Sequence, residues 1–254
     1  MPRWRNWFTR AIQNRIGVIL CGFESHPRHY FMSRAKLPDK NFKWTPKLAY
    51  IIGLITTDGN LSKDERHIDF TSKDLQLINL FKNCLKLKNK VGLKSSGFSG
   101  KKYLRIQFGN VVFYRWLQRL GLTPHKSKTI GALKIPDKYF PDFLRGHLDG
   151  DGSIITYKDY WNTFKNPKYI YTRLWVKFIS VSKIHIEWLR ENIIRLLSIK
   201  GFLIQDKIYQ PHQAIGMCGL KFGKKESIKL LSWLYYSPNV PCLIRKRKIA
   251  EKFI

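Results

Sequence analysis

Residues 51–60, IIGLITTDGN, recur 93 residues later as LRGHLDGDGS, residues 144–153. Each copy has the pattern of a short apolar helix that ends in an acid followed by a glycine. In this register two positions correspond closely, a glycine within the helix and an aspartate at its end: Gly53 with Gly146, and Asp58 with Asp151. The repeat predicts a chain made of two similar halves, each organised around one of these helices.

The paired glycines and aspartates predict a metal site between the two helices. A glycine inside a helix costs about 1 kcal/mol relative to alanine, and close approach of a second backbone is one reason to keep it. We therefore expect the helices to cross at Gly53 and Gly146. Asp58 and Asp151 would then lie side by side at the negative ends of two helix dipoles, where a divalent cation such as Mg²⁺ would relieve their repulsion. In one copy alone, a simple helix stop would be the better interpretation, but two copies in register favour a site.

The two nonapeptides 51–59 and 144–152 resemble the paired signature of the LAGLIDADG homing endonucleases. The second copy is the closer match, because Thr56 and Thr57 stand where the signature has Asp-Ala. The resemblance covers about residues 42–254. It implies an α+β fold of two pseudo-symmetric αββαββα repeats, each with a curved antiparallel sheet, that together form a DNA-binding saddle. The expected domains are an N-terminal extension 1–41, a first repeat 42–121, a linker 122–140, and a second repeat 141–254 with a basic C-terminal helix.

The charge of the chain points to a polyanionic partner. There are 47 Lys and Arg against 17 Asp and Glu, a net charge of +30, spread through segments that look folded. Nucleic acid is the first candidate and a membrane surface the second, but no apolar run is long enough to span a bilayer. The four cysteines contain no CxxC pair, which disfavours zinc and fits free thiols inside a cell. Residues 1–23 are basic without an acid, so an organelle is expected if they are a transit peptide, and cytoplasm or nucleoid otherwise.

The periodicity between and after the two motifs predicts the same order of elements in both halves. In the first half we expect a strand at 67–71, a helix at 73–87, a hairpin at 91–98 and 101–108, and a helix at 111–120. In the second we expect a strand at 171–180, helices at 183–199 and 224–236, a hairpin at 201–209 and 213–222, and a closing helix at 243–253. The first hairpin of the second half should be longer, around residues 157–169. Its aromatic and lysine content suits an extended DNA-contacting loop, or equally a variable surface loop.

The resemblance identifies the residues expected to carry chemistry. Asp58 and Asp151 would hold the metal, assisted by the backbone carbonyls of Thr57 and Gly150. A basic residue at a strand-to-helix junction of each repeat would orient water or stabilise developing charge. Two lysines, each preceded by a serine, match it and complete the expected catalytic set: Lys73 with Ser72, and Lys183 with Ser182.

Base recognition should fall to the outward faces of the strands, because a two-stranded ribbon fits the major groove. In the first half the candidates are Arg66, His67, Asp69, Tyr103, Arg105 and Gln107. In the second half they are Arg173, Trp175, Lys177, Gln205, Lys207, Gln213 and Lys221. Each could instead be an ordinary solvent-facing residue, and we expect about half to contact DNA.

By resemblance, the expected function is a Mg²⁺-dependent, site-specific endonuclease acting as a monomer. It would break both strands of a long asymmetric DNA target and leave 3′ overhangs, serving the mobility of an intron or intein. Mn²⁺ is expected to substitute, and Ca²⁺ to support binding without efficient cleavage. Two rivals are an RNA maturase, whose partner would be intron RNA, and a non-cleaving DNA-binding protein. The presence of both Asp58 and Asp151 favours the endonuclease.

Overall fold

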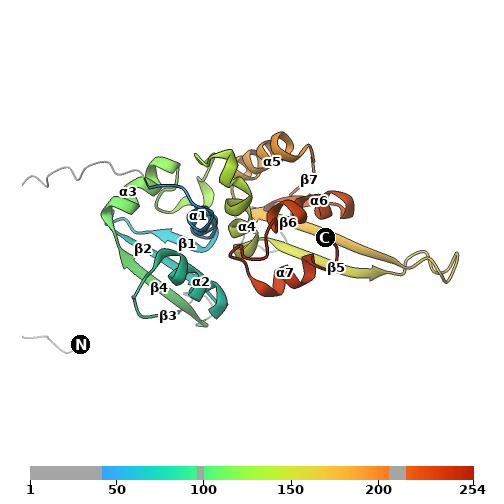
Figure 1. Cartoon of the computed structure of the whole chain (residues 1–254), viewed down its shortest axis with the longest axis horizontal. Coiled ribbons are helices and arrows are strands. Elements are labelled where there is room, and N and C mark those ends of the chain that lie inside the picture. Colours follow the sequence, from blue (N-terminus) through green and yellow to red (C-terminus); the bar gives the residue numbers. More distant parts are fainter. Residues whose placement is uncertain (1–41, 96–99, 206–215) are drawn as a thin grey trace, which may run out of the picture. The chain divides into compact units, whose positions relative to one another are not determined.

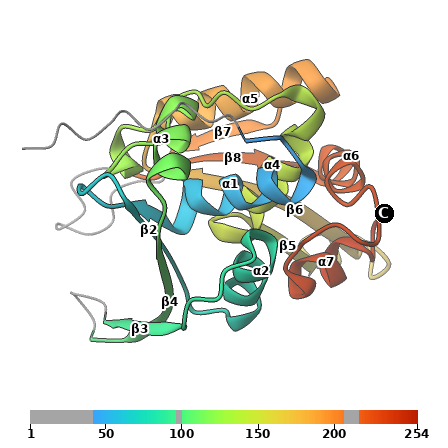
Figure 2. The ribbon, with the colours of Figure 1, turned by 60° about the vertical axis from the view of Figure 1, so that its left-hand side comes forward.

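The computed structural model describes residues 42–95, 100–205 and 216–254, which belong to one compact unit. The expected extension 1–41 lies outside the described residues. At the centre of the unit the two motif helices, α1 (Pro46–Asp58) and α4 (Phe140–Gly150), lie side by side (Figures 1 and 2). Helix α1 begins where the Thr45 hydroxyl accepts a hydrogen bond from the Leu48 N–H at 3.1 Å, with proline at the first helical position.

The predicted crossing of the two helices at their glycines is confirmed. A β-carbon added to Gly53 would lie 2.1 Å from the carbonyl oxygen of Phe143, and one added to Gly146 would lie 2.1 Å from that of Tyr50. Both obstacles are backbone atoms, which cannot move aside as a flexible side chain can. Only glycine at these two positions lets the helices approach this closely, and the approach places the ends of both helices together.

The first half continues with β1 (Gly59–Leu61), β2 (His67–Ser72), α2 (Leu75–Leu85), β3 (Gly92–Ser95), β4 (Lys102–Gly109) and α3 (Val111–Leu120). Its four strands form an antiparallel sheet in the order β1-β2-β4-β3. Helix α3 ends at Gly121, whose φ of 107° is a left-handed conformation that glycine adopts without strain.

The second half repeats this order with β5 (Ser153–Asp159), β6 (Tyr171–Ser180), α5 (Lys183–Leu197), β7 (Phe202–Gln205), β8 (Cys218–Phe222) and α6 (Lys224–Leu234). Its antiparallel sheet has the equivalent order β5-β6-β8-β7. The fold class is therefore confirmed as α+β, with two four-stranded antiparallel sheets in repeated αββαββα units. The chain then adds α7 (Ile244–Ala250), which is shorter than the expected closing helix.

Each sheet buries one face against helices, as the alternation of apolar residues predicts. In β6, Leu174, Val176 and Phe178 are fully buried, and across the pair Phe178 lies opposite the equally buried Leu220. In β4, Ile106 is buried while its neighbours Arg105 and Gln107 face the other side. The polar residues of these strands lie on the opposite face of each sheet.

The segment that connects the halves packs into the core instead of forming a loose linker. Leu122, Ile130 and Leu133 are buried, and a short 3₁₀ helix at Lys126–Lys128 holds Lys126 in the interior. The hydroxyl of Ser182 donates to the Ile130 carbonyl at 2.5 Å, which ties the segment to the second half. Within the part of the chain that the structure describes, no helix is long and apolar enough to cross a membrane.

Candidate active site

Two carboxylates meet where α1 and α4 end. A β-carbon on Gly150 would lie 2.0 Å from the Thr57 hydroxyl and 3.1 Å from Oδ2 of Asp58, so the last turns of the helices are in contact. Burial, together with the negative charge of Asp151, raises the pKa of Asp58 to about 7. Burial also raises the pKa of Asp151. Without a bound metal ion, this pair resists full ionisation at neutral pH.

Two buried lysines that the sequence analysis did not single out accompany the carboxylates. Lys126 donates to the Gly59 carbonyl just beyond α1. Lys246, from α7, donates to the carbonyls of Leu148, Asp149 and Gly152 at 2.5, 3.0 and 2.7 Å. Burial lowers the pKa of each lysine to about 8, while Asp58 and Asp151 oppose that change by favouring the charged form.

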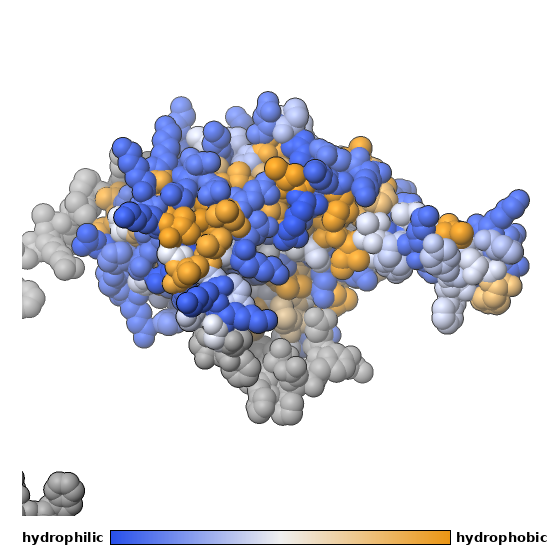
Figure 3. Space-filling view, turned by 90° about the horizontal axis from the view of Figure 1, so that it is seen from below, coloured by the Kyte–Doolittle hydropathy of each residue, from blue (hydrophilic) through white to orange (hydrophobic). Residues whose placement is uncertain are grey.

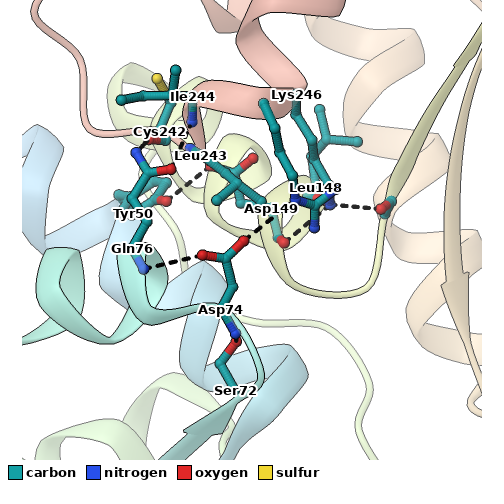
Figure 4. Close-up of polar contacts among 12 residues, drawn as sticks. Tyr50, Ser72, Asp74, Gln76, Leu148, Asp149, Cys242, Leu243, Ile244 and Lys246 are labelled. Atoms are coloured by element: carbon teal, nitrogen blue, oxygen red, sulfur yellow. Dashed lines mark hydrogen bonds and ion pairs between the residues drawn. The ribbon is translucent and has the colours of Figure 1, made fainter. Parts of the chain in front are cut away.

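The segment that carries Lys246 is fixed to both halves by polar contacts (Figure 4). Asp149 accepts hydrogen bonds from the Tyr50 hydroxyl at 2.8 Å and from the Leu243 N–H at 2.7 Å. Gln76 of α2 donates to the Cys242 carbonyl at 3.3 Å and accepts from the Ile244 N–H at 3.2 Å. Asp149 therefore joins α4 to α1 and to the segment that leads into α7.

A fully buried arginine makes a further attachment. Arg145 donates to the Leu234 carbonyl at 2.6 Å and to the Pro241 carbonyl at 2.8 Å, and it pairs with Asp142 at 2.5 Å. Because Leu234 and Pro241 bracket the turn that leads to α7, Arg145 holds that turn against α4.

The two aspartates line different cavities. A cavity of about 370 Å³ beside Asp58 is lined also by Ser72, Lys73, Tyr103 and Arg245, with Asp149 and Gly150 of the opposite helix. A smaller cavity of about 140 Å³ beside Asp151 includes Thr56 and Thr57 of α1 among its walls. Each cavity thus combines the aspartate of one motif helix with residues of the other.

The predicted basic residues are placed differently in the two halves. Lys73 lines the cavity of Asp58, together with Ser72. Lys183 is 71% exposed, pairs with Glu187 at 3.6 Å, and does not line the cavity of Asp151. Ser182 is buried and caps α5, so its hydroxyl is already engaged by the backbone.

Two stacked histidines, His147 and His185, line the second cavity, where the first cavity has Lys73. The Nε2 atoms of His147 and His185 lie 3.2 Å apart, and His185 Nδ1 donates to the Gly131 carbonyl at 2.9 Å. His185 Nε2 must therefore accept, and His147 Nε2 donates to it. Burial lowers the pKa of both, to about 4 for His185, so the pair is neutral at physiological pH.

The oxygen donors at the helix ends fit Mg²⁺. Mg²⁺ is usually bound through one or two carboxylates, several waters and the phosphates of a substrate. Asp58 and Asp151, with the carbonyls of Thr57 and Gly150, supply that kind of ligand. Among the described residues no group of three or more His, Cys, Asp or Glu side chains is gathered as it would be around a metal ion.

The outward face of the first sheet gathers most of its candidate DNA contacts. Tyr103, Arg105 and Gln107 share one face of β4, as predicted. Asp69 is only 3% exposed and accepts from Arg105 Nη2 at 2.9 Å, with Lys94 at 3.9 Å. Asp69 is thus placed to orient Arg105. Arg66 immediately precedes β2, and the His67 ring forms a hydrogen bond with the Asp64 carboxylate.

In the second sheet, Arg173, Trp175, Lys177 and Lys221 share the outward face. Lys177 lies opposite Lys221, whose ammonium sits 3.8 Å from the centre of the Trp175 ring. The expected outward orientation of Gln205 was wrong, because Gln205 lies opposite Cys218 and therefore on the other face from Lys221, although its side chain is exposed. Lys207 and Gln213 lie outside the described residues.

Comparisons with known proteins bear on the fold. Residues 45–105 match the family model described as a LAGLIDADG-like domain. The LAGLIDADG meganuclease I-AabMI bound to uncleaved DNA is 14% identical, with 83% of this chain and 89% of that chain covered and a TM-score of 0.54. The homing endonuclease I-WcaI bound to its DNA recognition sequence is 13% identical, with 82% and 88% covered and a TM-score of 0.52.

A third structure, full-length DUF199/WhiA from Thermatoga maritima, is 16% identical with a TM-score of 0.49. The match covers 84% of this chain but only 63% of that protein. The comparison with curated proteins found no match.

Proposed function

We propose that this chain, which contains a LAGLIDADG-like domain and has the LAGLIDADG fold, is a metal-dependent, site-specific DNA endonuclease that cuts both strands of its target. The observation that carries the proposal is the meeting of Asp58 and Asp151 at the crossing of two helices, with the buried Lys126 and Lys246 beside them. Such an arrangement is costly for stability, because two carboxylates and two ammonium groups lose their hydration.

Two outward-facing basic sheets would hold the DNA. Arg105 and Gln107 in the first half, and Arg173, Lys177 and Lys221 in the second, lie on the faces that the helices leave uncovered. Because the halves carry different side chains on these faces, the target would be long and asymmetric. One chain supplies both carboxylates, so a monomer suffices.

The reaction would use Mg²⁺, or Mn²⁺ in its place, to activate water and stabilise the leaving oxygen of each phosphodiester. Asp58 and Asp151 would hold the metal from opposite helices, each with a backbone carbonyl of the other helix, from Gly150 or Thr57. Lys126 and Lys246 would keep positive charge beside the carboxylates, favouring their ionised, metal-binding form. Lys73 lines the first cavity, where it would orient water or stabilise developing negative charge.

The second centre would work without the equivalent lysine side chain. Lys183 is directed to Glu187, and the neutral His147–His185 pair lines the cavity of Asp151. The two strands would therefore be cut by centres with different side chains. Time courses with each strand labelled should show unequal rates.

The test begins with selection of a bound sequence from randomised duplex DNA. The selected duplex is then incubated with the wild type, Asp58→Asn, Asp151→Asn and Asp137→Asn in Mg²⁺. Asp137 is an exposed carboxylate paired with Arg195, and it serves as the matched control. We expect the wild type and Asp137→Asn to cut and leave 3′ overhangs, and both site variants to bind without cutting.

Two results would contradict the proposal. If the site variants cut at rates near the wild type, the carboxylates are not the metal ligands. If the wild type binds its selected duplex but cuts in neither Mg²⁺ nor Mn²⁺, the chain is a binding protein for DNA or for intron RNA. In Ca²⁺ we expect binding without efficient cleavage.

A further inference from the structure

A two-stranded ribbon extends past the second sheet. Strand β6 pairs with β8 only from Val176 onward, whereas its pairing with β5 continues from Ile154 opposite Val176 out to Asp159 opposite Tyr171. Figure 1 shows β5 and β6 running beyond the neighbouring helices and ending in a turn. Residues 160–170, here called the ribbon tip, therefore project beyond the part of β6 that pairs with β8.

The ribbon tip displays large aromatic rings to solvent. Trp161 is 81% exposed, Phe164 75% and Tyr160 53%. In Figure 3 the ribbon stands out from the rest of the unit, with apolar surface among polar surface near its end. Clustered exposed rings at a projecting tip indicate a binding surface, because nothing in the described part of the chain covers them.

Local hydrogen bonds give the ribbon tip a defined structure. Asp159 accepts from the Trp161 N–H at 3.0 Å and from Arg173 Nε at 2.7 Å. The Thr163 hydroxyl donates to the Tyr160 carbonyl at 2.7 Å, and Asn166 accepts from the Lys168 N–H at 2.9 Å. The rings are therefore presented by an organised turn, which reduces the entropy lost on binding.

The charge around the rings selects the kind of partner. Residues 155–173 contain Lys158, Lys165, Lys168 and Arg173 but a single acid, Asp159, which is occupied by Arg173. Cations interspersed with flat rings match a chain of phosphates and bases, because the phosphates attract the cations and the bases stack on the rings.

The ribbon also continues the outward face of the sheet. Ile155 lies opposite Trp175, Tyr157 opposite Arg173 and Asp159 opposite Tyr171, so these residues share the face that carries Lys177. The Arg173 guanidinium lies 5.7 Å from the centre of the Tyr171 ring. A cationic, aromatic path thus leads from the sheet to the ribbon tip.

We propose that the ribbon tip is a stacking site for unpaired nucleotides, with Trp161 and Phe164 as its two platforms. Unpaired nucleotides are favoured over a duplex because bases within a duplex already stack on each other, and opening them costs energy. The site would hold a single-stranded flank of DNA or an unpaired segment of RNA. It goes beyond the proposed cleavage activity, and its function does not require that activity.

The test measures binding of the full chain in EDTA, where cleavage cannot interfere. The probes are fluorescent oligo(dT) and oligo(U) of about 20 nucleotides, and a blunt duplex of the same length. In one variant, Trp161→Leu with Phe164→Leu, apolar bulk remains but the aromatic faces are lost. In its matched control, Trp161→Phe with Phe164→Tyr, both rings remain.

We expect the leucine variant to bind the single strands at least about fivefold more weakly for each lost ring, with duplex affinity changed less than about twofold. The control should bind like the wild type. The comparison of oligo(dT) with oligo(U) identifies which nucleic acid is preferred. Unchanged single-strand affinity in the leucine variant would overturn the proposal, as would equal losses on single strands and duplex. Cleavage of the selected duplex by the leucine variant is a separate readout, so failure of either proposal can be told from failure of the other.

Discussion

Replacing Asp58 with asparagine should stabilise the metal-free protein while it abolishes cleavage. In the folded chain the pKa of Asp58 rises from 3.8 to about 7, because the carboxyl is buried and faces Asp151. Above pH 7 the folded protein must therefore hold an unfavourable charge that the unfolded chain carries in water. Asparagine has nearly the same shape without that charge, so the variant avoids this cost.

The size of the effect follows from the pKa. A change from 3.8 to about 7 corresponds to a ceiling of about 4 kcal/mol, at about 1.36 kcal/mol for each pH unit. Water at the partly exposed carboxyl screens some of this, so we expect a gain of about 2–4 kcal/mol at pH 8. Because the pKa is raised on folding, the wild type loses stability as pH rises through 7. The gain should therefore fall toward zero near pH 4.

The assay is urea unfolding in EDTA between pH 4 and pH 8, with cleavage of the selected duplex measured in parallel. Asp137→Asn is a control that should change stability in the opposite direction. The hydrogen bond from Arg195 lowers the pKa of Asp137, so losing this carboxylate should slightly reduce the stability of the fold above pH 4. The reasoning is refuted if Asp58→Asn is less stable than the wild type at pH 8, or if its gain does not depend on pH.

Three further outcomes are expected. Gly53→Ala should lower the free energy of unfolding by at least about 1–3 kcal/mol, because the added β-carbon would lie 2.1 Å from a backbone oxygen. Gly92→Ala is the control, because the nearest atom to its added β-carbon is 4.0 Å away, and it should have little effect in thermal melts. Arg105→Ala should relax base preference in one half-site by about 1–3 kcal/mol and also destabilise the fold, because Asp69 loses its nearest cation; an unchanged substrate-library profile would contradict the assigned orientation of β4. Duplex affinity should fall steeply between about 50 and 200 mM salt, as expected for a chain of charge +30, and a flat response in a binding titration would exclude an interface dominated by phosphates.

The fold was largely readable from the sequence because its main determinants are local. The repeated motif predicted two helices that cross at glycine, and the alternation in residues 103–108 and 173–178 predicted which face each strand buries. At Gln205 the prediction failed because residues 202–204, Phe-Leu-Ile, show no polar alternation from which the face could be read. Only pairing with β8 decides the orientation there.

The site was only partly readable, because some of its groups gain their setting from tertiary structure. Lys126 lies in the expected linker, and Lys246 lies in the expected basic C-terminal helix. A usable signal existed, since a Lys-x-Lys triplet follows a proline after the third helix of each half, Lys126 to Lys128 and Lys246 to Lys248. The two triplets are separated by a different number of residues from the two motifs, so aligning the halves on the motifs does not bring the triplets into register.

The attachment of α7 has a consequence for protein synthesis. The ribosome makes the chain from its amino end, so both motif helices have been synthesised well before residue 246. Until then, the carbonyls of Leu148, Asp149 and Gly152 lack the ammonium group that binds them in the finished protein. A nascent chain therefore lacks this contact until α7 has been made, and translation arrested before α7 would yield a polypeptide without that lysine. The proposed nuclease would in this way complete its second centre only after α7 has been translated.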